Sequence, residues 1–535
     1  MKNTLCTLVI LIGIIAPIQN AHTQELPTYE GNGLYNAGDT KNLGAGIYHQ
    51  AKRSQIATLI KSTNKTGWVA LDVLTTNLLL TSADLSTLQN DIQSTNGSDL
   101  FTLRLEKLLH WGQHKKAYAL YSTIKDGAQN QRTAKAGMIA LLFNGERGKA
   151  CLEIKTLFPQ FKDDIFWQEM NAYCTLSHST ERTGAQWDIL ISSDNKIITD
   201  LLTNKNFKTP YNPETFNELS LIEQALLTAH NAIDISSLEI SEYRRIHSNN
   251  ILPILQNTNL SDDQRVTLYG LAALNGLIDE GNLTNIYENT NKDAQSGLSQ
   301  IAKILDDIDG AIIPASRRTK IEQAFKLANT YGDGILLPFL NEISKIDADD
   351  LNLGHVERAI RLFMLTNTLP PSEWISDLAS IDTDDLEKKK LIEKLVFSIN
   401  TLSKPVDKNE IKASQKIITP YLLSDAFANG LNIIIENIDS TENNSDKVFN
   451  IYENGFDLAA KKSYTMPPLV IIDELTRSSK NQHIAQTVLL AAIIANNTTN
   501  RDVHLETLGH ITTALTHSGF EVEARKILAQ AILEN

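Results

Sequence analysis

The sequence predicts an all-α fold, an α-solenoid of antiparallel helix pairs. Glycine in a tight turn lets one helix end, and an alanine five residues later lets the next helix approach closely. The spacing of Ala117, Ala150 and Ala185, 33 and then 35 residues, is typical of a two-helix repeat. The predicted turn and packing residues are Gly112 with Ala117, Gly145 with Ala150, Gly519 with Ala524, and Ala185, which follows Thr180 at the same offset.

A second recurrence supports the same period. IDADDL at 346–351 returns as IDTDDL at 381–386, 35 residues later. Calcium binding is the functional interpretation, but an EF-hand loop needs acidic or polar ligands and a glycine where Leu351 and Asn352 stand. Helix capping explains the recurrence, and it predicts Asp347 and Asp382 as N-caps.

Composition breaks divide the chain into four parts. Residues 1–23 have the features of a signal peptide, and the Gly- and Asn-rich residues 24–50 form an irregular arm. Helical periodicity then covers an N-terminal lobe, 51–205, and a C-terminal lobe, 206–535, with Pro210 and Pro213 at the junction. We find no alternating apolar and polar pattern typical of a strand. The last helix is expected to cap the solenoid with one buried and one wet face.

The N-terminus predicts export. Lys2 precedes an apolar run from Leu5 to Ile18, which contains Pro17 and is too short for a typical membrane span. Cleavage after Ala21 or Thr23 would release a protein into the periplasm, and an uncleaved anchor is the alternative. The longest later apolar run is Val488–Ala495, so we expect no membrane insertion after signal removal.

Export also determines how the cysteines are interpreted. Loss of the signal peptide removes Cys6 and leaves Cys151 and Cys174, which are equidistant from the turn at FPQFKDD. Residues equidistant from the turn of a helical hairpin lie level, so a disulfide is predicted in an oxidising compartment. Two separate buried thiols are the alternative.

The charge of the chain limits its partners. The formal net charge is −14, and this acidity argues against nucleic acid and anionic membrane surfaces as main partners.

The Gly-to-Ala turn followed by an apolar residue resembles the tetratricopeptide repeat family. GERGKACLEI and GFEVEARKIL carry the likeness most fully, while the Trp and Tyr positions of the first repeat helix are filled inconsistently. The N-terminal half also resembles a group of uncharacterised exported bacterial helical-repeat proteins. These resemblances imply an extracytoplasmic solenoid and carry over no catalytic residues.

No catalytic, cofactor or metal site is predicted. The sequence has neither a G-x-S-x-G elbow nor a P-loop. His510 and His517 are two turns apart, too far to share one zinc ion, and His504 adds no ligand at the right spacing. Helix packing is favoured over a sugar-binding face for the tryptophans, which are Trp68, Trp111, Trp167, Trp187 and Trp374.

The favoured function is that of an exported, noncatalytic scaffold or adaptor that binds another envelope protein of unknown identity. Stacked helix pairs produce extended surfaces suited to that purpose. One alternative is an envelope enzyme of the glycan lyase type with a superhelical body. Another is a protein that binds a glycan or small ligand between its lobes, for which a groove lined by tryptophans would be the sign.

Overall fold

The computed structural model describes residues 29–91, 99–125, 127, 130–179, 183–193, 195–292, 295–366, 368–403, 467–496 and 505–534. In these ranges the chain is mostly helical, and the strands are one two-residue parallel pair. The predicted all-α class is therefore confirmed. The predicted signal peptide, Thr180 and His504 lie outside the described residues.

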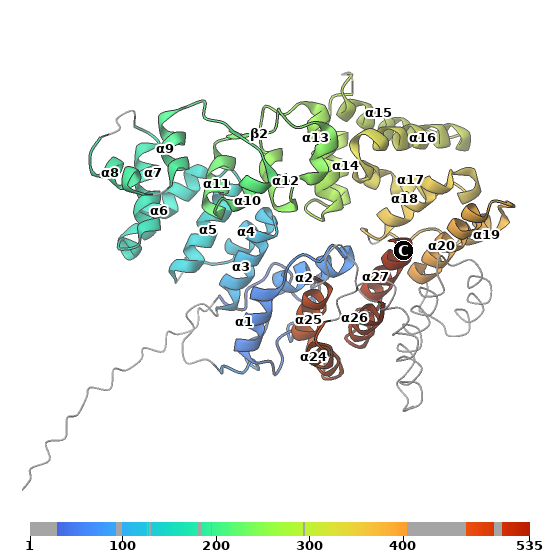
Figure 1. Cartoon of the computed structure of the whole chain (residues 1–535), viewed down its shortest axis with the longest axis horizontal. Coiled ribbons are helices and arrows are strands. Elements are labelled where there is room, and N and C mark those ends of the chain that lie inside the picture. The colour runs from blue at the N-terminus through green and yellow to red at the C-terminus, as the bar shows by residue number, and fades with distance from the viewer. Residues whose placement is uncertain are drawn as a thin grey trace, which may run out of the picture.

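The helices of the N-terminal half follow one another through short turns (Figure 1). They are α1 Arg53–Ser62, α2 Val69–Leu80, α3 Leu100–His110, α4 His114–Tyr121, α5 Gln131–Phe143, α6 Arg147–Phe161, α7 Ile165–Leu176, α8 Ala185–Ser192 and α9 Lys196–Thr203.

The middle of the chain mixes α-helices with short 3-10 helices (η) and the strand pair. These elements are β1 Thr209–Pro210, α10 Pro213–Glu218, α11 Leu221–Ala229, β2 Ile233–Asp234, η1 Ile240–Arg245, α12 Ser248–Leu255, α13 Asp262–Leu274, α14 Glu280–Glu288, α15 Gly297–Asp309, α16 Pro314–Tyr331, η2 Asp333–Phe339, α17 Leu340–Ile343, η3 Ala348–Asp350, α18 Leu353–Phe363, α19 Glu373–Ser380 and α20 Leu386–Ser403. The last described elements are α24 Leu469–Lys480, α25 Ile484–Asn496, α26 Leu505–His517 and α27 Glu521–Glu534.

The arm before α1 is irregular, yet it is anchored. Glu30 is buried and forms an ion pair with buried Arg53, with Nη2 and Oε2 2.9 Å apart. Arg104 of α3 is fully buried and donates to five backbone carbonyls, including those of Glu30 at 2.8 Å and Asn32 at 2.7 Å. These buried charges are paired or hydrogen-bonded, as burial requires, and they attach the arm to the first helices.

Two clusters of buried hydrophobic side chains hold the molecule together. The first takes in residues from Tyr29 to Leu277 together with side chains of α24–α27, and the second takes in residues from Val266 to Leu402. The segment at the predicted 205/206 boundary belongs to the first cluster, and both clusters contain residues of α13 and α27. The division into two lobes stays a prediction.

The C-terminal helices return to the N-terminal ones (Figure 1). Helix α25 packs on α1 and α2, while α27 packs on α2, α18, α20 and α26. Gln530 of α27 accepts a hydrogen bond from the Val69 N–H at 3.3 Å and donates to the Gly67 carbonyl at 3.2 Å. The expectation that α27 is an end cap with a wet face is wrong, because every residue from Ile527 to Leu533 is buried.

The three predicted glycine turns are confirmed in their conformation. Gly112, Gly145 and Gly519 have φ values of +73°, +74° and +88°. After each helix the glycine N–H and the next N–H bond back to carbonyls of the last helical turn, for example Gly145 to Leu142 and Glu146 to Leu141. This pattern is a Schellman motif, which satisfies the free carbonyls at a helix end.

The predicted alanines divide into two groups. Ala117, Ala150 and Ala524 are buried at 0%, 0% and 4% exposure, as close helix packing requires. Ala185 does not have this role, because it is exposed at the first position of α8 and the buried residue of that helix is Leu190. The preceding Gly184 is the N-cap, so the turn is built differently there.

Asp347 stands at the N-cap position of η3, as predicted, but the side-chain capping expected of Asp347 and Asp382 is not found in the described residues. Asp347 precedes η3 but makes no side-chain cap hydrogen bond, and Asp377 of α19 accepts from the Ala348 N–H at 3.1 Å instead. Helix α18 is capped by Asn352, which accepts from the Gly354 N–H at 2.8 Å. At the second copy Asp385, three residues after Asp382, accepts from the Glu387 N–H at 3.0 Å.

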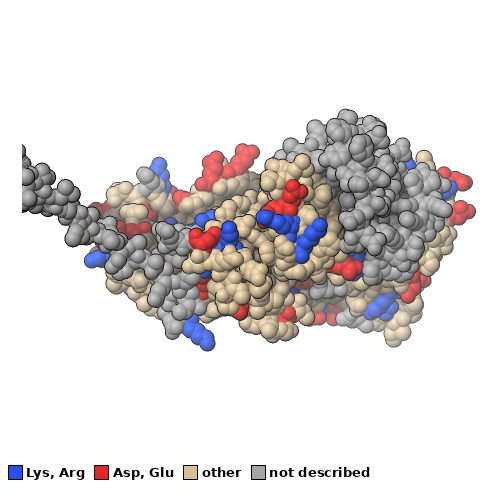
Figure 2. Space-filling view, turned by 90° about the horizontal axis from the view of Figure 1, so that it is seen from below, with Lys and Arg blue, Asp and Glu red and all other residues tan. Residues whose placement is uncertain are grey.

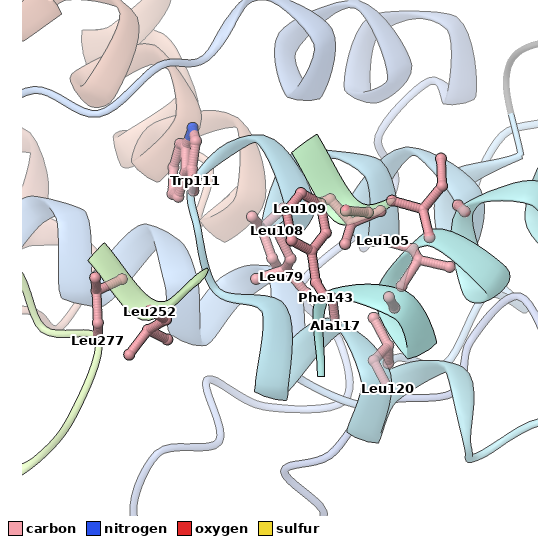
Figure 3. Packing of buried hydrophobic residues seen from close by; sticks show 14 of the residues in the cluster. Leu79, Leu105, Leu108, Leu109, Trp111, Ala117, Leu120, Phe143, Leu252 and Leu277 are labelled. Atoms are coloured by element: carbon pink, nitrogen blue, oxygen red, sulfur yellow. The ribbon is translucent and has the colours of Figure 1, made fainter. Parts of the chain in front are cut away.

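The α3–α4 turn packs against a distant part of the chain. Trp111 is 4% exposed and belongs to the same buried cluster as Leu252 of α12 and Leu277, all labelled in Figure 3. A Cβ placed on Gly112 would lie 2.5 Å from the Asn249 Cα. Gln113 donates to the Gly276 carbonyl at 3.3 Å, so this turn contacts the turn after α13 as well.

The surface mixes charges of both signs. On the face seen in Figure 2, the described Lys and Arg side chains are interspersed with Asp and Glu. Among the described helices, none combines the length and apolar character needed to cross a membrane.

Candidate ligand pocket

A pocket of about 320 Å³ lies where α6 begins and where α7, α9 and α11 end. Its lining is mainly polar and basic, with an apolar wall from α9 and the loop after it. The lining residues are Arg147, Ser177, His178, Ser179, Leu201, Leu202, Asn204, Lys205, Phe207 and His230.

The α6–α7 hairpin positions the basic side of the pocket. Arg147 is the first residue of α6, one turn before Cys151. Tyr173 of α7 directly precedes Cys174. Cys151 and Cys174 form the predicted disulfide, with Cα atoms 5.4 Å apart. The covalent bond therefore joins α6 and α7 close to the positions of Arg147 and Tyr173.

The end of α11 positions His230. The chain leaves this helix through Asn231, whose φ of +51° takes the place of a glycine. The Asn231 N–H bonds to the Thr228 carbonyl and the Ala232 N–H to the Leu227 carbonyl, again a Schellman motif. His230 is the C-cap residue, so the geometry of the turn fixes its position at the pocket.

Arg147, Tyr173 and His230 form one interacting group. The Tyr173 hydroxyl and His230 Nε2 share a 2.7 Å hydrogen bond. Arg147 Nη1 lies 3.4 Å from Nε2 and 3.5 Å from Nδ1. A point in the ring plane at nearly equal distance from both nitrogens would clash with Cε1, so the guanidinium nitrogen lies over the ring face.

This arrangement favours neutral imidazole. Burial, assisted by the nearby Arg147 charge, lowers the pKa of His230 to about 4. Burial raises the pKa of Tyr173 to about 12. At neutral pH the group therefore carries the single positive charge of Arg147, with two neutral hydrogen-bonding rings behind it.

Among the described residues that line the pocket, none is Asp or Glu. Throughout the described ranges, no acidic side chain lies within ion-pairing distance of Arg147 or Lys205. In a chain with net charge −14, a pocket whose described lining residues are all basic or neutral is unusual.

Comparison with known proteins does not place the chain in a family. No family model, curated protein or solved structure matches it. The pocket must therefore be interpreted from its own chemistry.

Sequence reasoning identified the disulfide but missed the pocket next to it. Arg147 stands four residues before one cysteine and Tyr173 one residue before the other, which is the signal that could have found them. His230 carries no such signal, since only the fold brings residues 147 and 230 together.

The other predicted residues do not contribute to the pocket. The packing glycines and alanines are absent from its lining, as are the tryptophans. Trp68, Trp111, Trp167 and Trp374 are buried at 4% exposure or less, so they pack the core and offer no sugar-binding face. Over the described ranges, no group of three or more His, Cys, Asp or Glu side chains is arranged to hold a metal ion.

Proposed function

We propose that the protein is an exported, noncatalytic scaffold or adaptor that binds another envelope protein. The observation that carries the proposal is the pocket between α6, α7, α9 and α11, whose described lining combines basic and hydrogen-bonding groups with apolar side chains. Binding sites are typically concave, preformed and lined in this mixed way. The disulfide supports preorganisation, since it joins the two helices that carry Arg147 and Tyr173.

The finer description of the fold belongs to the same proposal. We propose that the helices are tetratricopeptide-like antiparallel pairs of a solenoid, and that its two ends meet through α27. The Schellman turns at Gly112, Gly145 and Gly519, with buried alanines five residues on, support a repeated unit. The packing of α27 on α2 and α20 supports the meeting of the ends.

Export to the periplasm is supported by the disulfide, since such bonds persist in oxidising compartments. Intact-mass measurement of periplasmic protein, with and without reduction before thiol alkylation, tests this. We expect alkylation of Cys151 and Cys174 only after reduction. Free thiols in the unreduced protein would contradict the proposal.

Partner capture is best tested in cells by placing a photocrosslinking amino acid at single positions. His178 and Lys205 line the pocket and are exposed, while exposed Arg245 on η1 lies outside the lining and is the control. We expect one envelope protein to be captured from the two pocket positions and not from position 245. The same labelling at all three positions would reject a specific partner site.

The size of the pocket also favours a second candidate, binding of a free small ligand. A volume of about 320 Å³ is at the lower end of that of known ligand sites. Native mass spectrometry of protein purified from the periplasm distinguishes the two candidates. A retained small ligand would add a small, defined mass to that of the protein, whereas binding of a partner protein would give no such small mass increase.

A further inference from the structure

We propose that this pocket binds a carboxylate group attached to an apolar body, such as the end of a peptide chain or a free organic acid. The inference rests on the proposed binding function and names the chemistry that the pocket recognises. It follows from the charge of Arg147, which has no acidic partner among the described residues, and from a described lining that contains apolar side chains and no Asp or Glu.

The first step of the argument concerns the donors of Arg147. A guanidinium has five N–H groups and presents them in a planar fork that matches a carboxylate. The contacts of Nη1 are with the imidazole ring of His230, a neutral partner. Arg147 is half-buried, so its charge faces the pocket without being fully solvated. Since Arg147 has no acidic partner among the described residues, a ligand carboxylate would supply one.

The next step concerns the ends of α7, α9 and α11, which all lie at the pocket. Helix C-termini carry partial negative charge and would oppose an anion. Here, however, several carbonyls of the last turns are bonded. The Ser177 N–H bonds to the Tyr173 carbonyl, the Ser177 hydroxyl to that of Cys174, and the Asn204 N–H to that of Asp200. Because these partial charges are engaged and fade within one turn, the full charge of Arg147 dominates.

The remaining step concerns the apolar wall. Leu201 and Leu202 are buried and Phe207 is half-buried, and all three line the pocket. A bare phosphate would leave this wall unused. A carboxylate on an aliphatic or aromatic body would pair with Arg147 and cover the wall at the same time, which favours carboxylate over phosphate.

The test is calorimetric titration of the purified, disulfide-intact protein. The probes are N-acetylphenylalanine, its uncharged amide, the peptide acid acetyl-Ala-Ala-Phe, its amide, and inorganic phosphate. We expect the Kd of each acid to be lower than that of its amide by a factor of about ten or more, as charge-assisted pairing implies. Tighter binding of the peptide acid identifies a chain end as the source, and tighter binding of the small acid identifies a free metabolite.

Variants separate recognition from folding. Arg147→Ala should lose the preference for acid over amide, Arg147→Lys should keep part of it, and Arg245→Ala should bind as the parent does. Far-UV circular dichroism and the melting temperature check that each variant is folded. Equal binding of acid and amide by the parent, an acid preference that survives Arg147→Ala, or phosphate as the tightest ligand would each overturn the proposal.

If Arg147 has a purely structural role, in which its charge offsets the partial negative charges of the helix C-termini, a different result is expected. The parent would then show no acid preference, and Arg147→Ala would only lower the melting temperature. The outcome for the scaffold function is separate. If the Arg147→Ala variant captures the envelope partner at the parental yield, the scaffold function stands, but carboxylate recognition by Arg147 is not part of partner binding.

Discussion

At the scale of single residues, the three turn glycines have the same backbone conformation and different surroundings. A Cβ on Gly519 would meet nothing within 4 Å, and one on Gly145 would meet only the Gln256 side chain, at 3.6 Å. A Cβ on Gly112 would lie 2.5 Å from the Asn249 Cα and 2.9 Å from the Ser248 carbonyl oxygen. Gly112 therefore serves both a helix end and a contact between distant parts of the chain.

This difference predicts unequal costs for the same substitution. Gly519→Ala should destabilise the protein by about 1 kcal/mol, the cost of a left-handed alanine. Gly112→Ala should cost about 3 kcal/mol or more, because backbone atoms must also move. Urea denaturation of both variants provides the comparison. Equal losses would show that the close approach at Gly112 contributes nothing to stability.

The correction of the aspartate caps gives a second prediction. Asn352→Ala and Asp385→Ala should each cost about 1 kcal/mol, because each removes an acceptor of N-terminal helix N–H groups. Asp347→Ala and Asp382→Ala serve as matched controls in the same two segments and should change stability by less than about 0.5 kcal/mol. Thermal denaturation measures all four, and a larger loss at Asp347 or Asp382 would show that these aspartates are the caps after all.

At the scale of helices, α27 joins the two ends of the described chain. Its residues belong to both hydrophobic clusters, with Ile527 in the first and Leu533 in the second. Arg361 of α18 donates to the Leu533 carbonyl at 2.9 Å, while Gln530 bonds to the backbone at the start of α2, at Gly67 and Val69. A helix with partners on several sides couples the elements around it.

Ala524→Arg should therefore act beyond the last helix pair. Ala524 is 4% exposed, so an arginine there forces α27 away from its neighbours. We expect faster hydrogen exchange in α2 and α20 as well as in α26. Val522→Arg is the control, since Val522 is on the same helix and 47% exposed. Faster exchange confined to α26 and α27 would show that α27 is only an end unit.

The contrast between these elements shows what sequence can and cannot predict. A Schellman turn is local: a glycine and the periodicity of one helix are enough to predict Gly112, Gly145 and Gly519. The turns at Asn231 and Gln482 adopt positive φ without glycine. Asparagine is the usual alternative at such a position, but glutamine gives no such signal in the sequence. The disulfide was predictable because both cysteines lie on one hairpin.

Long-range contacts are not encoded in this way. The packing of α27 on α2 joins residues more than 400 positions apart, for example Val69 and Gln530. An apolar stripe shows that a helix has a buried face but not which partner covers it, and for that reason the pattern of α27 predicts an end cap. The pocket was missed on the same physical grounds, since Arg147 and His230 meet only through the fold.

At the scale of the whole molecule, buried histidines link folding to pH. His114, the first residue of α4, is 1% exposed and stacks on Phe143 with ring centroids 3.8 Å apart. Burial lowers the pKa of His114 to about 3 and, with the charge of Arg147, that of His230 to about 4. Below the ordinary histidine pKa of about 6.5, these histidines bind protons in the unfolded chain but not in the folded chain, so acid lowers the stability of the fold.

Carboxyl groups act in the opposite direction: burial raises the pKa of Asp72, Glu153 and Glu280, and most clearly that of Glu393. Burial raises the pKa of Glu393 to about 7, so the folded state holds a proton there that the unfolded state releases above its ordinary pKa. Acid therefore strengthens the fold at Glu393 and weakens it at the two histidines. We expect the histidines to have the larger effect. The pKa shifts of His114 and His230 together exceed that of Glu393, and burial lowers the pKa values of His110, His355 and His510 in the same direction.

The expected result is a melting temperature that falls as the pH is lowered from about 6.5 to about 4. His114→Gln should flatten this decline, because it removes the histidine whose pKa is lowered most, and His230→Gln should flatten it less. His178→Gln is the matched control, since His178 is exposed at the pocket rim. Differential scanning fluorimetry across this range provides the measurement. A parent protein whose melting temperature rises on acidification, or a His114→Gln variant with the parental slope, would show that His114 is not kept neutral by its burial against Phe143.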